Sequence, residues 1–415
     1  MIETTIEKLV HGGQGLGTLP DGRKVFVWGA LPGEKVAIKV TKGKRSYAEA
    51  FTEQVIEPSP VRVAPREQNY LATSPWQIIE FAAENDYKKH IVEELFVQAH
   101  VTLPNFSMTT AGSDWHYRNK MEYSFWGDDD GLHLALHNRG SHNKSIVTGS
   151  ELALPAVDAA ANAIVDALQA LNPRAGDLKT VVVRADQQGN TVASLFVKRE
   201  DFHRLALPEG LQGLRVYYSN PKSPASVPTK LLYERGDALL TDTLLGKSFT
   251  YDGDSFFQVN IPVFEAALAR IAEHLHGDSV LDMYAGVGSI GLSVAHKQVT
   301  LVELDPATVS MAGVNATASS LETEVVETSS EKALEYITGD KPVIFDPPRA
   351  GLHDKVVART LETLPPQIIY LSCNPATQAR DMAKLQEQYT ITYFEGFNFF
   401  PHTPHIETLA VLAKK

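Results

Sequence analysis

The chain has 415 residues, a formal net charge of -12 and 43% hydrophobic residues, a composition typical of a folded protein with two or three domains. Its acidic balance argues against a protein that coats nucleic acid without specificity, because such binding depends on neutralising phosphates. The single cysteine excludes an intrachain disulfide and a cysteine-based zinc or iron-sulfur site, so we expect no metal and no iron-sulfur cluster.

The N-terminal sequence predicts a chain that stays in the cytoplasm. MIETTIEKLV has neither a basic start nor an apolar run. No apolar stretch approaches the roughly 18 residues that a membrane span needs. We therefore expect a cytoplasmic protein with no membrane partner. Separately, we expect a monomer.

Residues 1–57 predict a small β-barrel of the oligonucleotide-binding (OB) type. Five short segments with strand-like alternation are separated by glycine and proline turns. Four basic residues and no acidic one occur from Lys39 to Arg45, with Tyr47 close by. This run is either a solvated hairpin or a face that binds RNA, and the segment alone favours neither.

Residues 58–242 predict an α+β domain that follows the proline-rich linker EPSPVRVAP. A helix is expected over about 76–99, with paired charges such as Glu84 and Lys88 on its exposed face. A second helix is expected at 156–171, between strand-like segments. Within this domain the motif YRNK either contacts RNA or forms a structural salt bridge, through Tyr117, Arg118 and Lys120.

Residues 243–415 predict a doubly wound α/β domain. Helical patterns alternate with buried strands, as in SVLDMYAGVGSIGLSVA, VTLVELD, PVIFDPP and QIIYLSC. This alternation builds a parallel sheet that binds ligands at the carboxyl ends of its strands. The helix at 76–99 is expected to pack on this domain.

A nucleoside site is expected beside the first two of these strands. LDMYAGVGSIG places Gly286 and Gly288 in the turn after the first strand, where glycine lets the backbone approach a ligand. Glu303 ends the next strand, where an acid suits the two ribose hydroxyls of an adenosine. The glycine turn alone is weak evidence, because NAD sites share it.

Two further motifs predict chemistry at the same sheet edge. FDPPRAG places Asp346 at the end of a strand, and its two prolines favour a substrate-facing loop over a plain turn. LSCNPAT places Cys373 between a strand and a predicted helix. A lone cysteine is usually a packing residue, but a helix N-terminus stabilises a thiolate, so we predict a reactive thiol.

A thiolate beside an adenosyl cofactor suits methylation of carbon 5 of a pyrimidine. That carbon becomes nucleophilic only when a thiolate adds to carbon 6, and a base must then remove the carbon-5 proton so that the thiol is eliminated. Glu407, within FPHTPHIETLAVL, stands at the start of a predicted last strand and is the candidate base. The alternative for a lone glutamate is ordinary surface charge.

In this order, FFQVN, YAGVGSIGL, VELD, FDPPRAGL, LSCNPAT and FPHTPHIETLAVL resemble the RNA 5-methyluridine methyltransferase family, and the N-terminal barrel resembles its TRAM domain. The resemblance covers nearly the whole chain, and DPPR, SCNPAT and HIET together are highly specific. It implies that Cys373 is the nucleophile and Glu407 the base, with Phe256 and Phe257 near the flipped base. It further implies that S-adenosyl-L-methionine contacts Gln258, Tyr284, Glu303 and Asp346, beside the turn of Gly286 and Gly288.

The resemblance also implies domains and a substrate. The expected domains are a TRAM-like RNA-binding barrel at 1–57, an RNA-recognition domain at 58–242 and a class I methyltransferase domain at 243–415. Many TRAM-containing members hold an iron-sulfur cluster on four cysteines, but the corresponding segments REQNYLATSPWQ and VTGSELALP have none. Because chains with TRAM resemble the ribosomal RNA enzymes more than the tRNA enzyme, large-subunit (23S) ribosomal RNA is the predicted substrate and tRNA the alternative.

Three rival functions make different demands on these motifs. A non-catalytic RNA-binding protein with a vestigial methyltransferase domain would not need Cys373, Glu407 and Asp346 together. An NAD-dependent oxidoreductase would be stabilised by NAD rather than by S-adenosylhomocysteine. A DNA cytosine methyltransferase carries its cysteine after a different strand, in a Pro-Cys motif.

Overall fold

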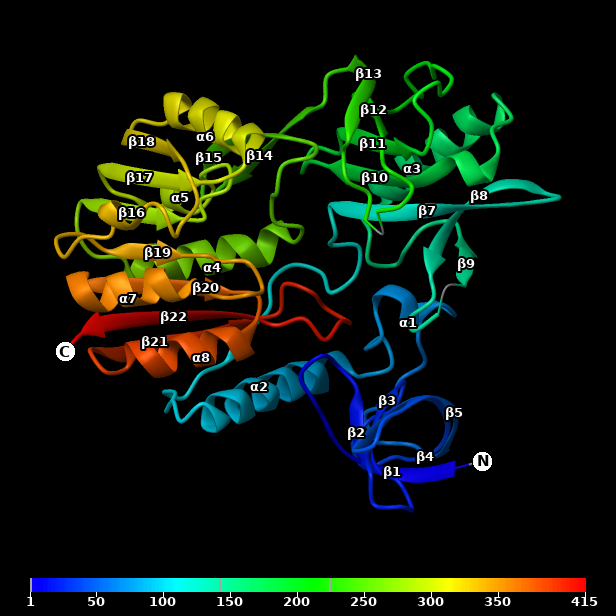
Figure 1. The fold of residues 1–415 in the computed structure, drawn as a ribbon, viewed down its shortest axis with the longest axis horizontal. Helices are drawn as coiled ribbons and strands as arrows, with labels where there is room; N and C mark the ends of the chain where they lie inside the picture. The colour runs from blue at the N-terminus through cyan, green and yellow to red at the C-terminus, as the bar shows by residue number, and fades with distance from the viewer. Residues whose placement is uncertain (1, 142, 224) are drawn as a thin grey trace. The chain divides into compact units, whose positions relative to one another are not determined.

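The computed structural model describes residues 2–141, 143–223 and 225–415, and its tertiary contacts divide the chain into two compact units. The first unit comprises the chain up to Thr110 together with Pro348–Leu352 and Leu371–Ala410. The second comprises Ala111–Pro347, His353–Tyr370 and Val411–Lys415. Because each unit combines separate stretches of the sequence, the two are described one at a time (ribbon in Figure 1).

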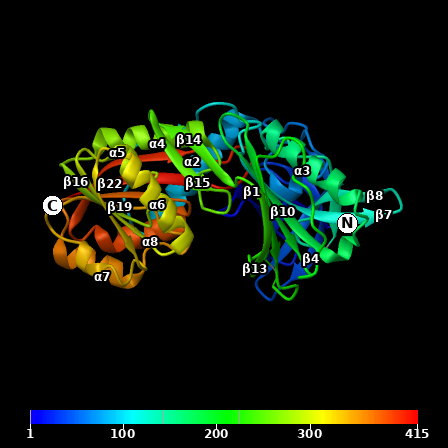
Figure 2. The ribbon, with the colours of Figure 1, turned by 90° about the horizontal axis from the view of Figure 1, so that it is seen from above.

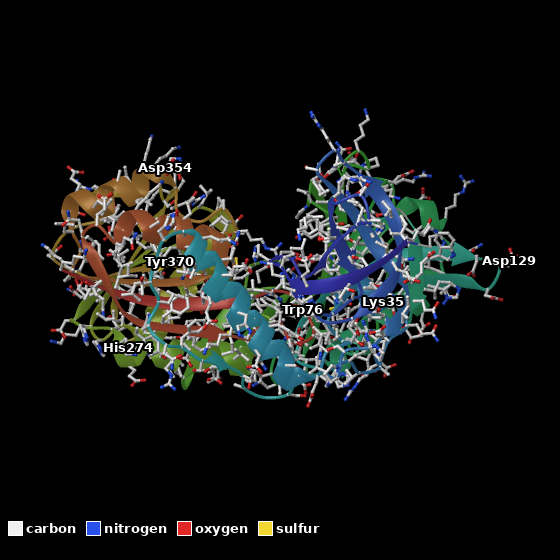
Figure 3. The ribbon with its side chains drawn as sticks, turned by 90° about the horizontal axis from the view of Figure 1, so that it is seen from below. Lys35, Trp76, Asp129, His274, Asp354 and Tyr370 are labelled. Carbon is white, nitrogen blue, oxygen red and sulfur yellow. The ribbon has the colours of Figure 1, made fainter. Side chains whose placement is uncertain are left out.

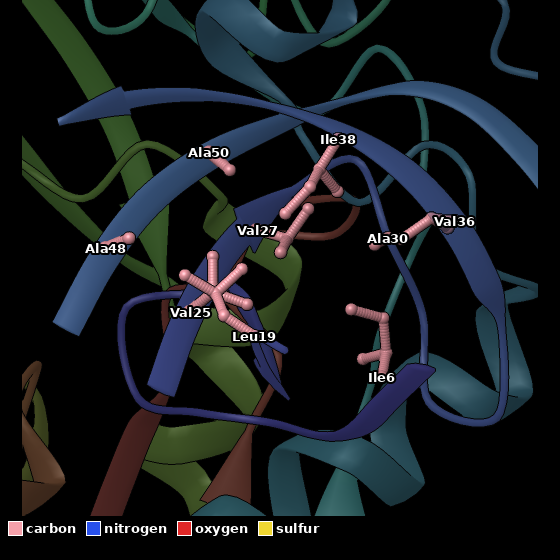
Figure 4. Packing of buried hydrophobic residues seen from close by; sticks show 9 residues of the cluster. All are labelled: Ile6, Leu19, Val25, Val27, Ala30, Val36, Ile38, Ala48 and Ala50. Carbon is pink, nitrogen blue, oxygen red and sulfur yellow. The ribbon is translucent and has the colours of Figure 1, made fainter. Parts of the chain in front are cut away.

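The first five strands close into a barrel in the order β1-β2-β3-β5-β4, as the sequence predicted. Successive side chains of a strand point to opposite faces, so the inward-facing set forms a continuous apolar core. Figure 4 shows nine of these buried residues, among them Val25, Val27 and Ile38, gathered inside the barrel. The strands are β1 (Ile2–Leu9), β2 (Gly15–Thr18), β3 (Lys24–Trp28), β4 (Lys35–Gly43) and β5 (Tyr47–Glu57).

A buried carboxylate fixes the linker to the barrel. Glu34 has no exposed surface, and its carboxylate accepts hydrogen bonds from the amides of Leu31 (2.8 Å) and Ser59 (3.1 Å). In the linker, the Arg62 guanidinium pairs with the same carboxylate and donates to the Gly29 carbonyl oxygen at 2.8 Å. The linker is therefore a fixed segment of the first unit.

Two helices follow, α1 (Tyr70–Thr73) and α2 (Phe81–Gln98). The predicted start of α2 at Trp76 is too early. Pairing with the linker occupies these residues, because Ile79 bridges Arg62 and the Glu80 amide donates to the Val61 carbonyl oxygen at 2.9 Å. The backbone amide of Trp76 instead donates to the carbonyl oxygen of His402 at 3.1 Å.

The prediction that Glu84 and Lys88 are exposed is wrong, because neither has exposed surface. Residues four apart lie on one face of a helix, and these two continue the buried stripe of Val92 and Phe96. α2 packs against α8 (Pro375–Leu385), also in the first unit.

The rest of the first unit contains strands from both ends of its sequence. Strand β6 (Met108–Thr109) pairs in parallel with β21 (Tyr389–Phe397), and β22 (Glu407–Lys414) begins in this unit. Phe394 on β21 meets Phe96 and Phe106 edge to face, with ring centroids 5.2 and 4.9 Å apart. Such pairs add about 0.5–1.5 kcal/mol beyond burial, so the Phe96 pair anchors α2 on β21 and the Phe106 pair anchors the segment before β6.

The second unit contains a seven-stranded sheet in the order β13-β12-β11-β10-β7-β8-β9. Helix α3 (Pro155–Gln169) lies along it, beside β10 in Figure 2, and buries a helical stripe that includes Val157, Ile164 and Leu168. The α+β pattern expected here is therefore observed. The strands are β7 (Lys120–Asp128), β8 (Gly131–His137), β9 (Lys144–Val147), β10 (Leu178–Ala185), β11 (Thr191–Val197), β12 (Gly213–Tyr218) and β13 (Lys230–Gly236), with a 3₁₀ turn η1 (Ala175–Asp177).

A hairpin of β14 (Leu239–Leu244) and β15 (Lys247–Asp252) leads to the parallel sheet, so the boundary expected after residue 242 falls inside β14. Within this unit the sheet runs β18-β17-β16-β19-β20, with every neighbouring pair parallel. Figure 2 shows α4 and α5 on one side of the strands and α7 on the other. Burial on both faces explains the nearly continuous apolar runs of β16, β17 and β20.

The remaining helices and strands alternate along the chain mostly as the sequence predicted. No helix in the described part of the chain combines the length and apolarity that a membrane crossing requires. The elements are α4 (Ile261–His274), β16 (Ser279–Met283), α5 (Gly291–Val294), β17 (Gln298–Glu303), α6 (Pro306–Ala318), β18 (Glu322–Glu327), η2 (Leu334–Tyr336), β19 (Val343–Phe345), α7 (Asp354–Thr363) and β20 (Gln367–Ser372).

Candidate active site

Three predicted cofactor residues lie at the carboxyl ends of adjacent parallel strands of the second unit. Tyr284 follows β16, Glu303 ends β17 and Asp346 follows β19. β16 pairs with β17 on one side and with β19 on the other. Because the carboxyl ends of neighbouring parallel strands meet at one edge, the structure brings these three residues together.

The turn after β16 adopts conformations that favour glycine. Gly286 and Gly288 have φ of +58° and +84°, and Tyr284 has φ of +67°, a value rare for a side chain of that size. A Cβ added at Gly286 would meet no described atom within 4 Å, whereas one at Gly288 would press on Leu292 and Leu301. Gly286 thus leaves open space for a ligand, and Gly288 allows the turn to pack.

Backbone amides orient the Glu303 carboxylate. Its Oε2 accepts from the Gly286 amide at 3.0 Å, and its Oε1 accepts from the amides of Leu304 (2.7 Å) and Asp305 (2.9 Å). An ionised carboxylate offers about four acceptor positions. At least one therefore remains for a ligand hydroxyl.

Two carboxyl groups beside these strand ends, Asp282 and Asp346, have a raised pKa. Asp282 has no exposed surface, and its Oδ2 accepts from the Gly291 amide at 2.7 Å. Burial raises the pKa of Asp282 to about 8, helped by the charges of Asp346 and Glu303 and opposed by the Gly291 hydrogen bond. Burial also raises the pKa of Asp346 to about 7. Near neutral pH the cluster therefore carries less negative charge than its sequence suggests.

The seven-stranded sheet holds the backbone of the segment that contains Gln258. The buried Arg184 on β10 donates to the carbonyl oxygens of Ser255 (2.9 Å) and Phe257 (3.3 Å). Asn119 donates through Nδ2 to the carbonyl oxygen of Gln258 at 3.1 Å. Sequence reasoning missed Arg184, although an arginine inside the apolar strand KTVVVRAD was an available signal.

The two phenylalanines of this segment have different environments. Phe257 is 1% exposed and stacks on Tyr251, with ring centroids 4.2 Å apart, so it belongs to the core. Phe256 is 65% exposed. Of the YRNK motif, Tyr117 and Asn119 are buried, which supports a structural role for these two positions.

In the first unit, Cys373 is half-buried and lies immediately before the N-terminus of α8, as predicted. Asn374 is the N-cap, and its side chain accepts a hydrogen bond from the Ala376 amide at 3.2 Å. The Asn374 amide in turn donates to Oγ of Ser372 at 3.2 Å. The thiol therefore lies at the N-terminal end of an 11-residue helix, where the helix dipole is positive.

The loop Pro348–Leu352 packs onto the first turns of α8. The carbonyl oxygen of Arg349 accepts from Nδ2 of Asn374 (2.8 Å) and from Oγ1 of Thr377 (3.2 Å). The Leu352 amide donates to Oδ2 of Asp381 at 2.8 Å. These bonds place the DPPR motif's arginine beside the cysteine's helix.

Glu407 is the first residue of β22 and is only 3% exposed, so the surface-charge alternative is wrong. It follows a loop in which Nδ1 of His405 lies 3.4 Å from a terminal nitrogen of Arg349. Among the described residues, no three His, Cys, Asp or Glu side chains are grouped so as to hold a metal ion.

The same loop is packed against the barrel. A Cβ added at Gly13, which has φ of +98°, would overlap Pro404. The indole of Trp76, labelled in Figure 3, donates to the Gly13 carbonyl oxygen at 3.0 Å. The β1–β2 turn, Trp76 and the loop before Glu407 thus form one packed layer of the first unit.

Comparisons with known proteins cover the whole chain. Family models match a TRAM domain at residues 1–51 and a tRNA (uracil-5-)-methyltransferase at residues 226–415. Uncharacterized RNA methyltransferases of Lactiplantibacillus plantarum and Enterococcus faecalis are each 30% identical, over 100% of this chain and 97% of their own. The crystal structure of the Pyrococcus abyssi tRNA (uracil-54, C5)-methyltransferase in complex with S-adenosyl-L-homocysteine shares the fold, with a TM-score of 0.79 and 21% identity over 99% of this chain and all of that one.

Proposed function

Because this chain belongs to the family of RNA (uracil-5-)-methyltransferases with an N-terminal TRAM domain, we propose that it methylates a uridine of RNA through a covalent adduct at Cys373, with Glu407 as the base. The observation that carries this proposal is a half-buried thiol at the N-terminus of α8, in the same unit as a buried glutamate that begins β22. We further propose that residues 1–57 and 58–242 bind RNA and that residues 243–415 are catalytic.

The cluster at the ends of β16, β17 and β19 fits S-adenosyl-L-methionine. Open space lies over Gly286, and the Glu303 carboxylate is held by amides with an acceptor position to spare. The carboxyl of Asp346, with its raised pKa, can donate or accept near neutral pH. When bound, the cofactor supplies an electrophilic methyl group. We propose that it is held by Gln258, Tyr284, Gly286, Gly288, Glu303 and Asp346.

The chain's own residues perform the remaining steps. The Cys373 thiolate adds to carbon 6 of uracil, which forms an S–C6 bond and moves the electron pair of the 5,6 double bond toward carbon 5. Carbon 5 then accepts the methyl group. Glu407 removes the carbon-5 proton, the double bond re-forms, and the S–C6 bond breaks to return the thiolate. The exposed Phe256 is the aromatic side chain proposed to lie near the flipped base.

Large-subunit (23S) ribosomal RNA is the proposed substrate, and tRNA is the second candidate. The TRAM domain favoured ribosomal RNA, but the Pyrococcus abyssi protein that shares the fold over 99% of this chain is named as a tRNA enzyme. Mapping 5-methyluridine in both RNA classes from cells with and without the gene decides between them, because only the true substrate loses the modification.

The catalytic pair is tested with Cys373→Ser and Glu407→Gln, using RNA from the deletion strain and labelled cofactor. The serine hydroxyl is a far weaker nucleophile at neutral pH, so Cys373→Ser should form no adduct and no product. Glu407→Gln keeps the nucleophile but cannot take the proton, so it should accumulate a methylated, denaturant-resistant protein-RNA adduct. Parental turnover by Glu407→Gln, or an adduct with Cys373→Ser, would show that the roles are misassigned.

A further inference from the structure

Two charged side chains of α2, Glu84 and Lys88, are buried without exposed surface, and the reaction steps above do not use them. Nζ of Lys88 lies 2.8 Å from Oε1 of Glu84. Removing such a pair from water is expensive, and replacing a buried pair with apolar residues is often neutral or stabilising. Stability alone is therefore a weak reason for its presence.

The pair holds the segment 398–406, which leads into Glu407, at three points. Lys88 donates through Nζ to Oδ1 of Asn398 (2.6 Å) and to the carbonyl oxygen of Phe400 (3.1 Å). The Glu84 carboxylate accepts from Nδ2 of Asn398 (2.9 Å). Its two oxygens also accept from the His402 amide, at 3.1 and 2.9 Å. Asn398 has no exposed surface and His402 is 3% exposed, so these bonds are shielded from water.

The backbone at the third point is strained. His402 has φ of +61°, a conformation that persists in a non-glycine residue only when its surroundings enforce it. The hydrogen bonds from the His402 backbone amide to the Glu84 carboxylate supply that constraint. Beyond it, Pro404 packs against Gly13, and Glu407 begins β22. The segment is thus confined by the charged pair on one side and the barrel turn on the other.

We infer that Glu84 and Lys88 are positioning residues, which fix segment 398–406 so that the Glu407 carboxylate is placed to remove the carbon-5 proton. This inference rests on the proposed function, because it takes Glu407 as the base. The pair acts through the segment and not on the substrate. Since a misplacement of about 1 Å can slow a step about a hundredfold, elimination is the step that should suffer.

The test compares two double variants of the same helix. Lys88→Met alone would leave the Glu84 carboxylate buried without its ammonium partner, which endangers folding. The double variant Glu84→Gln/Lys88→Met leaves no unpaired charge and removes the Lys88 hydrogen bonds to the segment. The matched control is Lys89→Met/Glu93→Gln, an i,i+4 pair whose charged atoms are 3.9 Å apart and whose side chains are 30% and 43% exposed.

With unmodified RNA and labelled cofactor, the buried-pair variant should form the methylated adduct at the parental rate and with an unchanged KM for RNA. It should then break the adduct down about a hundredfold more slowly. The control should behave like the parent. Hydrogen exchange of peptides covering 398–406 should also be faster in the buried-pair variant. A purely structural role would lower the folded fraction without accumulating adduct.

Two results would overturn the inference while leaving the proposed function intact. One is a buried-pair variant that breaks down the adduct at the parental rate, or whose segment 398–406 exchanges hydrogen at the parental rate, while Glu407→Gln still accumulates the adduct. The other is loss of adduct formation itself, because the damage would then not be confined to proton removal. If Glu407→Gln turns over like the parent, the proposed base is wrong and the inference falls with it.

Discussion

Replacing Asp282 with asparagine should change how stability depends on pH. In the folded chain burial raises the pKa of Asp282 to about 8, whereas an unfolded aspartate titrates near 3.9. Between those values the folded state holds a proton that the unfolded state has lost. The contribution of Asp282 to the free energy of unfolding therefore falls by about 1.4 kcal/mol per pH unit as pH rises through this window, or about 2.8 kcal/mol from pH 5 to pH 7. Above about pH 8 the decline from this group ends.

The substitution Asp282→Asn isolates this effect, because the amide keeps an oxygen for the Gly291 amide to donate to but cannot ionise. Urea unfolding of both proteins at pH 5, 6 and 7 should show the variant gaining stability relative to the parent as pH rises. Asp278→Asn is the control, because that side chain is 65% exposed and should leave the pH dependence parallel to the parent's. Parallel curves for Asp282→Asn would refute the buried, protonated carboxyl.

Two further predictions concern ligands. Glu303→Ala should weaken S-adenosylhomocysteine binding by about tenfold, for a lost charge-assisted hydrogen bond, and so reduce the thermal stabilisation by this ligand. The substitution also removes the acceptor of three amide hydrogen bonds, so the ligand shift is measured against the melting temperature of the ligand-free variant. An equal ligand shift would remove Glu303 from the site. On the barrel, alanine replacement of three exposed basic residues should reduce the slope of log affinity for RNA against log salt concentration by about 0.7–0.9 for each lost phosphate contact. Alanine replacement of Lys24 and Lys35, which are ion-paired, is the control. The three are Lys39, Lys44 and Arg45.

The features predicted well from sequence are those encoded by local periodicity. Period-two alternation within residues 1–57 predicted the barrel, and alternating helices and apolar runs predicted the parallel sheet. The position of Cys373 was predicted in the same way, because the apolar strand pattern ends just before it and a helix start signal, Asn374, follows it. Glu303 was found because it ends a strand in that repeating pattern.

The features that sequence reasoning missed depend on contacts between distant segments. Glu84 and Lys88 have the i,i+4 spacing of a solvated helix pair, and the segment that buries them begins more than 300 residues later, at Asn398. Their spacing from Val92 and Phe96 was the available sign, because it puts them on the apolar stripe. Arg184 was likewise missed because its carbonyl partners lie 71 and 73 residues later in the chain, although its place inside an apolar strand was an available sign.

The contact of Gly13 with Pro404 makes the barrel part of the scaffold for the C-terminal loop. Deleting residues 1–57 would remove the Gly13 contact with the loop as well as the exposed basic residues Lys39, Lys44 and Arg45. An inactive truncated protein would therefore not reveal which of the two losses caused the inactivity. Barrels exchanged between relatives should work best when the partner loop is transplanted with them. The first strands of the chain and its last loop should therefore change together between relatives, although almost the whole sequence separates them.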